Sequence, residues 1–97
     1  MIVNRRKFVA KQGAMDDLVA MMKAEAERIN LTIPFRLYTP SIAPFGLVAA
    51  EYEFESLEDY DKFWTDWFAR PETAEFMEKW AKLTESGGTN EIWNLEA

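Results

Sequence analysis

The sequence of 97 residues contains neither cysteine nor histidine. Without cysteine no disulfide can form, and this composition is typical of a cytoplasmic protein. The two missing residue types are also the usual ligands of zinc, copper and haem, and histidine is the usual general base near neutral pH. Catalytic triads built on a Ser–His or Cys–His pair are therefore excluded, and we expect neither a bound metal nor a cofactor.

Long hydrophobic runs are missing as well. No apolar segment approaches the roughly 20 residues needed to cross a bilayer, and Met1–Arg6 lacks the hydrophobic region of an export signal. We therefore expect a cytoplasmic protein that does not associate with membranes. The 17 acidic residues outnumber the 11 basic ones and give a net charge of −6. Because an acidic surface repels phosphate groups, the composition argues against a nucleic-acid partner.

Apolar residues, in contrast, are abundant: 48% of the chain is hydrophobic and 14% is aromatic. This is enough for a folded core, so we expect a single domain that spans residues 1–97. The apolar content also exceeds what one sheet needs when helices cover only one of its faces. The other face is then bare, and covering it usually requires a partner, so we expect a homodimer formed through the open sheet face.

The order of the hydrophobic periodicities predicts the fold. In four segments apolar and polar residues alternate, as in strands, and in two the apolar residues recur at the three- and four-residue spacing of helices. In chain order they are Ile2–Ala10 (strand), Ala14–Ile29 (helix), Ile33–Thr39 and Phe45–Phe54 (strands), Leu57–Glu85 (helical region) and Asn90–Leu95 (strand). This βαββαβ order predicts an α+β protein of the ferredoxin-like fold, with a four-stranded antiparallel sheet and helices on one face.

Local signals mark the ends of these elements. Gly13 is expected to adopt a positive φ in the turn after the first strand. Ser56 is a good N-cap for the second helical region, and Asp59 lies three residues later, as in an approximate capping box. The pair Arg70-Pro71 predicts a break that divides this region into two helices. We expect Gly87-Gly88 to end the second of them.

Two glutamates of the third strand are candidate site residues. Successive side chains of a strand point to opposite faces, so the even-numbered residues from Val48 to Phe54 face the helices. Glu51 and Glu53 then point to the open face. Their carboxylates lie about 7 Å apart, a separation compatible with acid–base chemistry. The alternative is that they form ion pairs with Arg5 and Lys7 of the neighbouring first strand, which is the interpretation we favour.

Three further residues could bind a ligand on the same sheet. Arg36 and Tyr38 share one face of the second strand, where a guanidinium and a hydroxyl could orient an anionic or carbonyl group. The alternative is an edge strand whose charge discourages aggregation. Trp93 of the last strand could stack on a flat ligand, whereas the helical spacing of the other tryptophans assigns them to the core. The candidate ligand-binding residues are Arg36, Tyr38, Glu51, Glu53 and Trp93.

Several short segments carry a family resemblance. The segment Arg6–Gly13 resembles the first strand of NIPSNAP-like proteins, in which a strand with an arginine and an aromatic residue ends in Lys-Pro-Gly. In this sequence Gln12 replaces that proline. The remaining similar segments are Phe45–Val48, Tyr52–Leu57, and Pro71-Glu72 followed by Phe76. The resemblance implies a dimeric α/β-barrel, in which two ferredoxin-like protomers pack their open sheet faces together.

The same superfamily includes cofactor-free antibiotic-biosynthesis monooxygenases, haem-degrading enzymes and muconolactone-isomerase-type proteins. The haem-degrading members hold iron with a histidine, which this chain lacks. NIPSNAP-like proteins offer no settled catalytic residues to carry over, so the resemblance supports a fold rather than an activity.

Three functions are compatible with the sequence. In the first, a homodimer binds a small hydrophobic or aromatic molecule in a pocket between sheet and helices. In the second, the protein is a cofactor-independent monooxygenase or isomerase of the antibiotic-biosynthesis type, in which Arg36, Tyr38, Trp93 and an asparagine orient the substrate and stabilise developing charge. In the third, it is a non-catalytic protein-interaction module. The sequence leaves open whether the protein is an enzyme.

Overall fold

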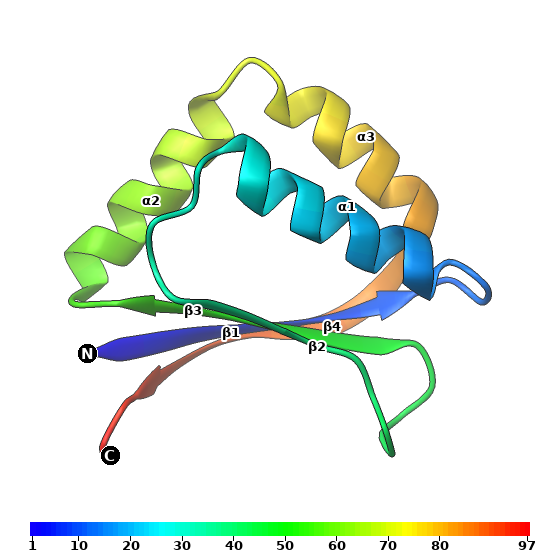
Figure 1. Ribbon diagram of the computed structural model, residues 1–97, viewed down its shortest axis with the longest axis horizontal. Helices are drawn as coiled ribbons and strands as arrows, with labels where there is room; N and C mark the ends of the chain where they lie inside the picture. The colour runs from blue at the N-terminus through cyan, green and yellow to red at the C-terminus, as the bar shows by residue number, and fades with distance from the viewer.

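Three helices pack on one face of a four-stranded antiparallel sheet in the computed structural model, which describes residues 1–97 (Figure 1). The strands stand in the order β2-β3-β1-β4. The elements are β1 (Ile2–Ala10), α1 (Met15–Arg28), β2 (Phe35–Tyr38), β3 (Leu47–Phe54), α2 (Leu57–Ala69), α3 (Thr73–Leu83) and β4 (Thr84–Asn94). This confirms the predicted ferredoxin-like βαββαβ fold.

Helix α1 and strand β3 supply the centre of the core. Leu18 of α1 and Val48 and Ala50 of β3 are fully buried, and Met22 packs with them. The predicted apolar stripe of the first helix and the predicted inward face of the third strand are therefore both correct. None of the three helices is long and apolar enough to cross a bilayer.

The helix ends follow the local signals. The side chain of Ser56 caps α2 by accepting a hydrogen bond from the backbone N–H of Asp59 at 3.1 Å. Helix α2 ends at Ala69 and α3 begins at Thr73, so the predicted break at Arg70-Pro71 is confirmed. Gly13 has the expected positive φ, 83°.

Strand β4 differs from the prediction. It begins at Thr84, directly after α3, whereas the sequence predicted a strand from Asn90. Gly87 and Gly88 lie inside the strand with φ values of 117° and 90°, and the register between β1 and β4 shifts beside them. The glycines therefore form a β-bulge rather than a helix stop, because glycine at positive φ is typical of some bulges as well as of helix ends.

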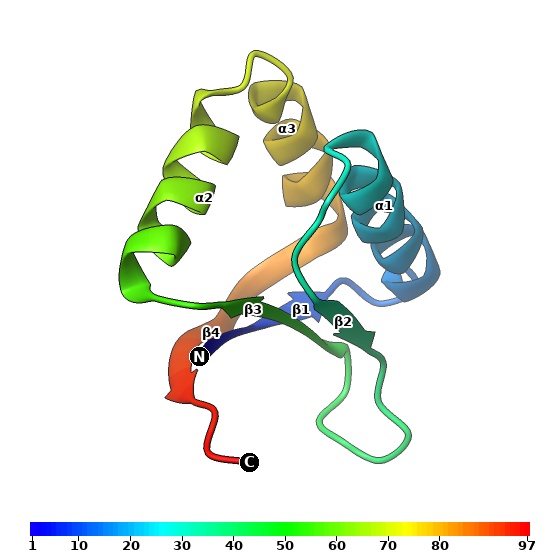
Figure 2. The ribbon, with the colours of Figure 1, turned by 60° about the vertical axis from the view of Figure 1, so that its left-hand side comes forward.

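The opposite face of the sheet carries no helix. The β2–β3 loop and the C-terminal segment both project on this side (Figures 1 and 2). The loop carries Ile42 and Phe45, whose side chains are fully exposed. One face of the sheet is thus enclosed, and the other is flanked by two projecting segments.

Candidate functional site

A pocket of about 110 Å³ lies between the sheet and the three helices. Helix α2 stands apart from α1 across the sheet (Figure 2). The residues that line the pocket come from all three helices and from the sheet. Fourteen of the sixteen lining residues are hydrophobic, so the charged pair Arg6 and Glu25 stands out. The aromatic walls include Phe8, Tyr52, Phe63, Trp64, Trp67 and Trp80.

Arg6 enters the pocket from β1. Its guanidinium carbon lies 3.9 Å from the ring centroid of Trp64, and its Nε donates to Oδ1 of Asn4 at 3.1 Å. Asn4 is fully buried and also accepts a hydrogen bond from Nε1 of Trp64 at 3.1 Å. Its Nδ2 donates to Oδ1 of Asn90 at 2.7 Å and to the carbonyl of Glu91 at 2.9 Å. Asn4 therefore fixes both the cation and the ring beneath it.

Glu25 lies on the α1 wall of the pocket. One of its oxygens accepts a hydrogen bond from Nε1 of Trp67 at 2.7 Å, and Arg28 donates two more at 2.7 Å each. Burial alone would raise the pKa of Glu25, but the hydrogen bonds from Arg28 and Trp67 outweigh it and hold the pKa below its usual value. The carboxylate is therefore negatively charged at neutral pH.

Tyr52 reaches the pocket from β3. Its ring and that of Trp64 pack edge to face, with their centroids 5.1 Å apart. Its hydroxyl has no hydrogen-bond partner in the protein. Burial raises the pKa of Tyr52 to about 12, with a further contribution from the charge of Glu25, while Arg6 opposes the rise. No fully buried polar side-chain atom lacks a partner, so this hydroxyl is not fully buried. It is a neutral hydrogen-bond donor at the pocket wall.

The guanidinium of Arg6 and the phenol of Tyr52, enclosed by aromatic rings, are suited to binding an aromatic molecule that carries oxygen atoms. Both donate hydrogen bonds to oxygen atoms, and the surrounding rings offer flat apolar surface to a planar molecule. The acidic residues of the chain do not form a group of three that could hold a metal ion. The pocket can therefore orient and polarise an oxygen-bearing aromatic ligand.

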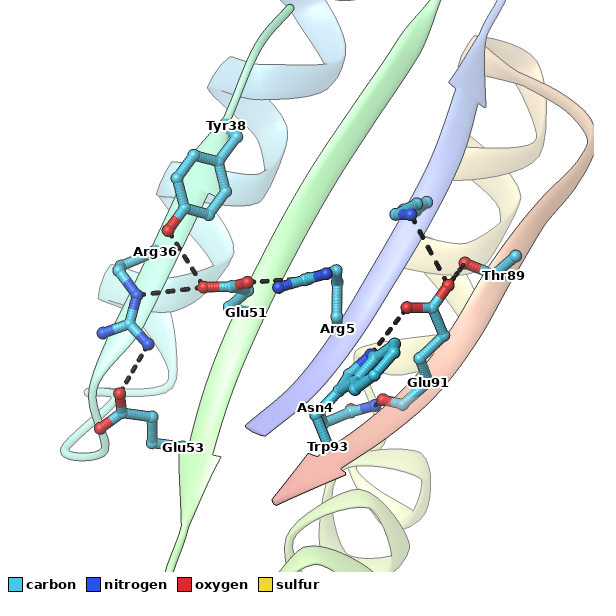
Figure 3. A network of polar contacts seen from close by, with 10 residues as sticks. Asn4, Arg5, Arg36, Tyr38, Glu51, Glu53, Thr89, Glu91 and Trp93 are labelled. Atoms are coloured by element: carbon cyan, nitrogen blue, oxygen red, sulfur yellow. Dashed lines mark hydrogen bonds and ion pairs between the residues drawn. The ribbon is translucent and has the colours of Figure 1, made fainter. Parts of the chain in front are cut away.

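The open face carries a network of ion pairs centred on Glu51 (Figure 3). Glu51 accepts hydrogen bonds from Nε of Arg5 at 2.8 Å, Nε of Arg36 at 3.2 Å and the hydroxyl of Tyr38 at 3.0 Å. Arg36 also donates to Glu53 at 2.6 Å. Burial would raise the pKa of Glu51, but these hydrogen bonds outweigh it and lower the pKa below the ordinary value.

Trp93 lies on the same face beside this network. Its Nε1 donates to Glu91 at 2.8 Å, and the guanidinium of Arg5 lies 5.8 Å from its ring centroid. The predicted pairing of Arg5 with Glu51 is confirmed. Lys7, however, pairs with Glu91 at 3.6 Å rather than with Glu53, because the register places Lys7 opposite Ala49.

The structure thus brings the predicted site residues together on the open face, where Arg36, Tyr38, Glu51 and Glu53 bond to one another and Trp93 lies nearby. None of the five lines the helix-side pocket. The sequence reasoning missed Arg6, Glu25 and Tyr52 as pocket residues. Strand alternation contains the signal for Arg6, since it shares its face with Asn4 and Phe8.

A second hollow, of about 600 Å³, lies at the turn after β1 and is larger in volume than the helix-side pocket. Its walls include Lys11, Gln12, Gly13 and Phe45, all of which are exposed. Only four of its nine lining residues are hydrophobic, and no group of aromatic rings encloses it. A small ligand would remain largely in water there, so the helix-side pocket is the better candidate.

No protein-family model matches the chain, and no curated protein does. Solved structures match well. A NIPSNAP domain protein from Burkholderia xenovorans superposes with a TM-score of 0.85 at 14% identity, over 100% of this chain and 96% of that one. A NIPSNAP family protein from Agrobacterium tumefaciens gives 0.80 at 20% identity, over 96% and 90%.

An antibiotic biosynthesis monooxygenase superposes with a TM-score of 0.73 at 13% identity, over the whole of both chains. At such identities the likeness concerns the fold. The chain therefore has the ferredoxin-like fold of NIPSNAP-family proteins, as the sequence resemblance implied.

Proposed function

We propose that the protein binds a small aromatic molecule in the helix-side pocket. The observation that carries this proposal is the aromatic enclosure itself, which holds one cation, Arg6, and one unpaired hydroxyl, that of Tyr52. An apolar cavity of about 150 Å³ is known to hold benzene. The pocket, with about 110 Å³, is on the scale of a single ring.

We further propose that two copies pair through the open sheet face. Across the strands Arg36, Glu51, Arg5 and Glu91 stand in one row of alternating charge, a pattern that two copies can match by symmetry. The exposed Ile42 and Phe45 of the projecting β2–β3 loop supply apolar contacts for the second copy. Because the carboxylates already have partners within the protomer, covering this face leaves none of them unpaired.

Light scattering tests the pairing. A dimer has a mass of 22.6 kDa, twice the 11.3 kDa of one chain. Phe45→Ser is expected to shift the mass toward that of the monomer. Leu57→Ser is the matched control, because Leu57 is also exposed but begins α2 on the helix side. A wild-type monomer at micromolar concentration contradicts the proposed dimer.

A substitution that fills the pocket tests the proposed ligand binding. Ala26 lines the pocket from α1, whereas Ala24 on the same helix is exposed. In a thermal-shift screen of single-ring aromatic compounds, ligands are expected to raise the Tm of the wild type and of Ala24→Leu. Ala26→Leu adds three heavy atoms inside the pocket and is expected to abolish the shift. Equal shifts in both variants contradict the pocket as the binding site.

The same screen separates the other functions. A hit that is consumed in air with uptake of oxygen would favour the monooxygenase type of activity. A screen without any hit, together with capture of a defined protein partner, would favour the interaction module.

A further inference from the structure

We propose that the ligand of the helix-side pocket is an aromatic acid, whose carboxylate binds Arg6 while its ring lies among the pocket's tryptophans. This inference rests on the proposed binding function and specifies the chemical class of the ligand. Arg5, Arg28 and Arg36 each form an ion pair with a glutamate. Of the two arginines without a carboxylate partner, Arg70 is exposed, whereas Arg6 is half-buried on the pocket side of β1.

The donors of Arg6 are partly used and partly free. Its Nε donates to Asn4, whereas its two terminal nitrogens form no hydrogen bond or ion pair in the protein. The terminal nitrogens of a guanidinium present a planar fork that matches the two oxygens of a carboxylate. A half-buried cation in an apolar pocket also gains more from an anion than an exposed cation would, because less water competes for it.

Arg6 is held in place before any ligand arrives. The ring of Trp64 lies against its guanidinium, and Asn4 binds both side chains through a single oxygen. Asn4 is itself fully buried and anchored to β4 by two hydrogen bonds. Such an arrangement reduces the loss of side-chain freedom on binding, which is the main cost of ordering an arginine.

Glu25, on the α1 wall, sets the orientation of the ligand. Glu25 is ionised and its oxygens accept hydrogen bonds from Arg28 and Trp67, so it repels an anion rather than binding it. The acidic group is therefore expected to lie toward Arg6 and away from Glu25. An aromatic cation, the obvious ligand of a tryptophan-rich cage, is disfavoured there by the charge of Arg6.

Calorimetry with three probes of equal ring size tests the inference: benzoate, benzamide and phenyltrimethylammonium. Benzoate is expected to bind the wild type about tenfold more tightly than benzamide, since it can form two charge-assisted hydrogen bonds with the fork of Arg6, each roughly twice as strong as a neutral one. Arg6→Gln is expected to remove this preference, because it weakens the binding of benzoate more than that of benzamide. Arg6→Lys is expected to retain part of the preference, because it keeps the charge and loses the fork.

Arg5→Gln is the matched control, since Arg5 is the neighbouring residue of β1 and faces the open side. It is expected to leave the benzoate preference unchanged. If Arg6→Gln does not fold, the wild-type ratio of benzoate to benzamide and the Arg6→Lys variant decide the question. Equal binding of benzoate and benzamide, or preference for the aromatic cation, overturns the inference and leaves the proposed pocket intact. Failure of all three probes to bind contradicts both proposals.

Discussion

Replacing Glu51 by glutamine should destabilise the fold, because it removes the charge at the centre of the open-face network. The side chain of Glu51 is only 11% exposed and accepts three hydrogen bonds, from Arg5, Arg36 and Tyr38. Hydrogen bonds to charged groups contribute about 1.5–3 kcal/mol each, which sets an upper limit of roughly 5–9 kcal/mol.

The actual cost should be well below that limit. The side chains of Arg5 and Arg36 are 38% and 42% exposed, so water can solvate them once their partner is neutral. Glutamine also keeps one acceptor oxygen. Discounted for solvent screening, the expected loss is about 2–3 kcal/mol. For a domain of this size that corresponds to a fall in Tm on the order of 10–20 °C.

The loss should depend on pH. Because the pKa of Glu51 is lowered in the folded state, its contribution is fully present above the unfolded-state pKa of about 4.3 and is lost as the pH falls through the folded-state pKa. Urea unfolding at fixed protein concentration, at pH 7 and below pH 4, should show the gap between wild type and Glu51→Gln narrowing in acid. Glu75→Gln is the control, since Glu75 forms only an exposed ion pair with Lys79. A loss at pH 7 no larger than that of the control would refute the reasoning.

Two further predictions concern the backbone. Gly88→Ala should unfold at much lower urea concentration than Gly13→Ala. A Cβ at Gly88 would collide with the carbonyl of Lys7, whereas Gly13 has a similar positive φ but open space around it. Equal losses would mean that φ alone decides the cost. Ser56→Ala should lower the free energy of unfolding, measured with urea, by about 1 kcal/mol, because the cap of α2 is lost. The control Ser41→Ala, in the exposed β2–β3 loop, should leave it unchanged. An unchanged free energy of unfolding in Ser56→Ala would show that the cap contributes nothing.

Alternation and helical spacing were sufficient to predict the fold from the sequence. They also placed Glu51 and Glu53 on the open face, because a strand turns successive side chains to opposite sides whatever its neighbours are. The partners of these carboxylates depend on register, which a single sequence does not fix. For this reason the sequence predicted a glutamate of β3 as the partner of Lys7, whereas Lys7 pairs with Glu91 of β4.

The helix-side pocket was harder to predict in detail. Strand alternation separates Arg6 from Arg5 and Lys7, but it does not say which side chains surround Arg6. The contacts that define the role of Arg6 join residues far apart in the chain, such as Asn4 with Trp64 and Asn90. The bulge at Gly88 was missed for a related reason, since a glycine pair serves a helix end and a bulge equally well.

Nuclear magnetic resonance of the four tryptophan indoles tests most directly whether the helix-side pocket is the binding site. Trp64, Trp67 and Trp80 line the pocket, while Trp93 lies on the open face and serves as an internal control. On titration with benzoate, the indole N–H signals of Trp64 and Trp67 should shift, because their hydrogen bonds to Asn4 and Glu25 form part of the pocket wall. The signal of Trp93 should stay in place. Movement of the Trp93 signal alone would contradict the account.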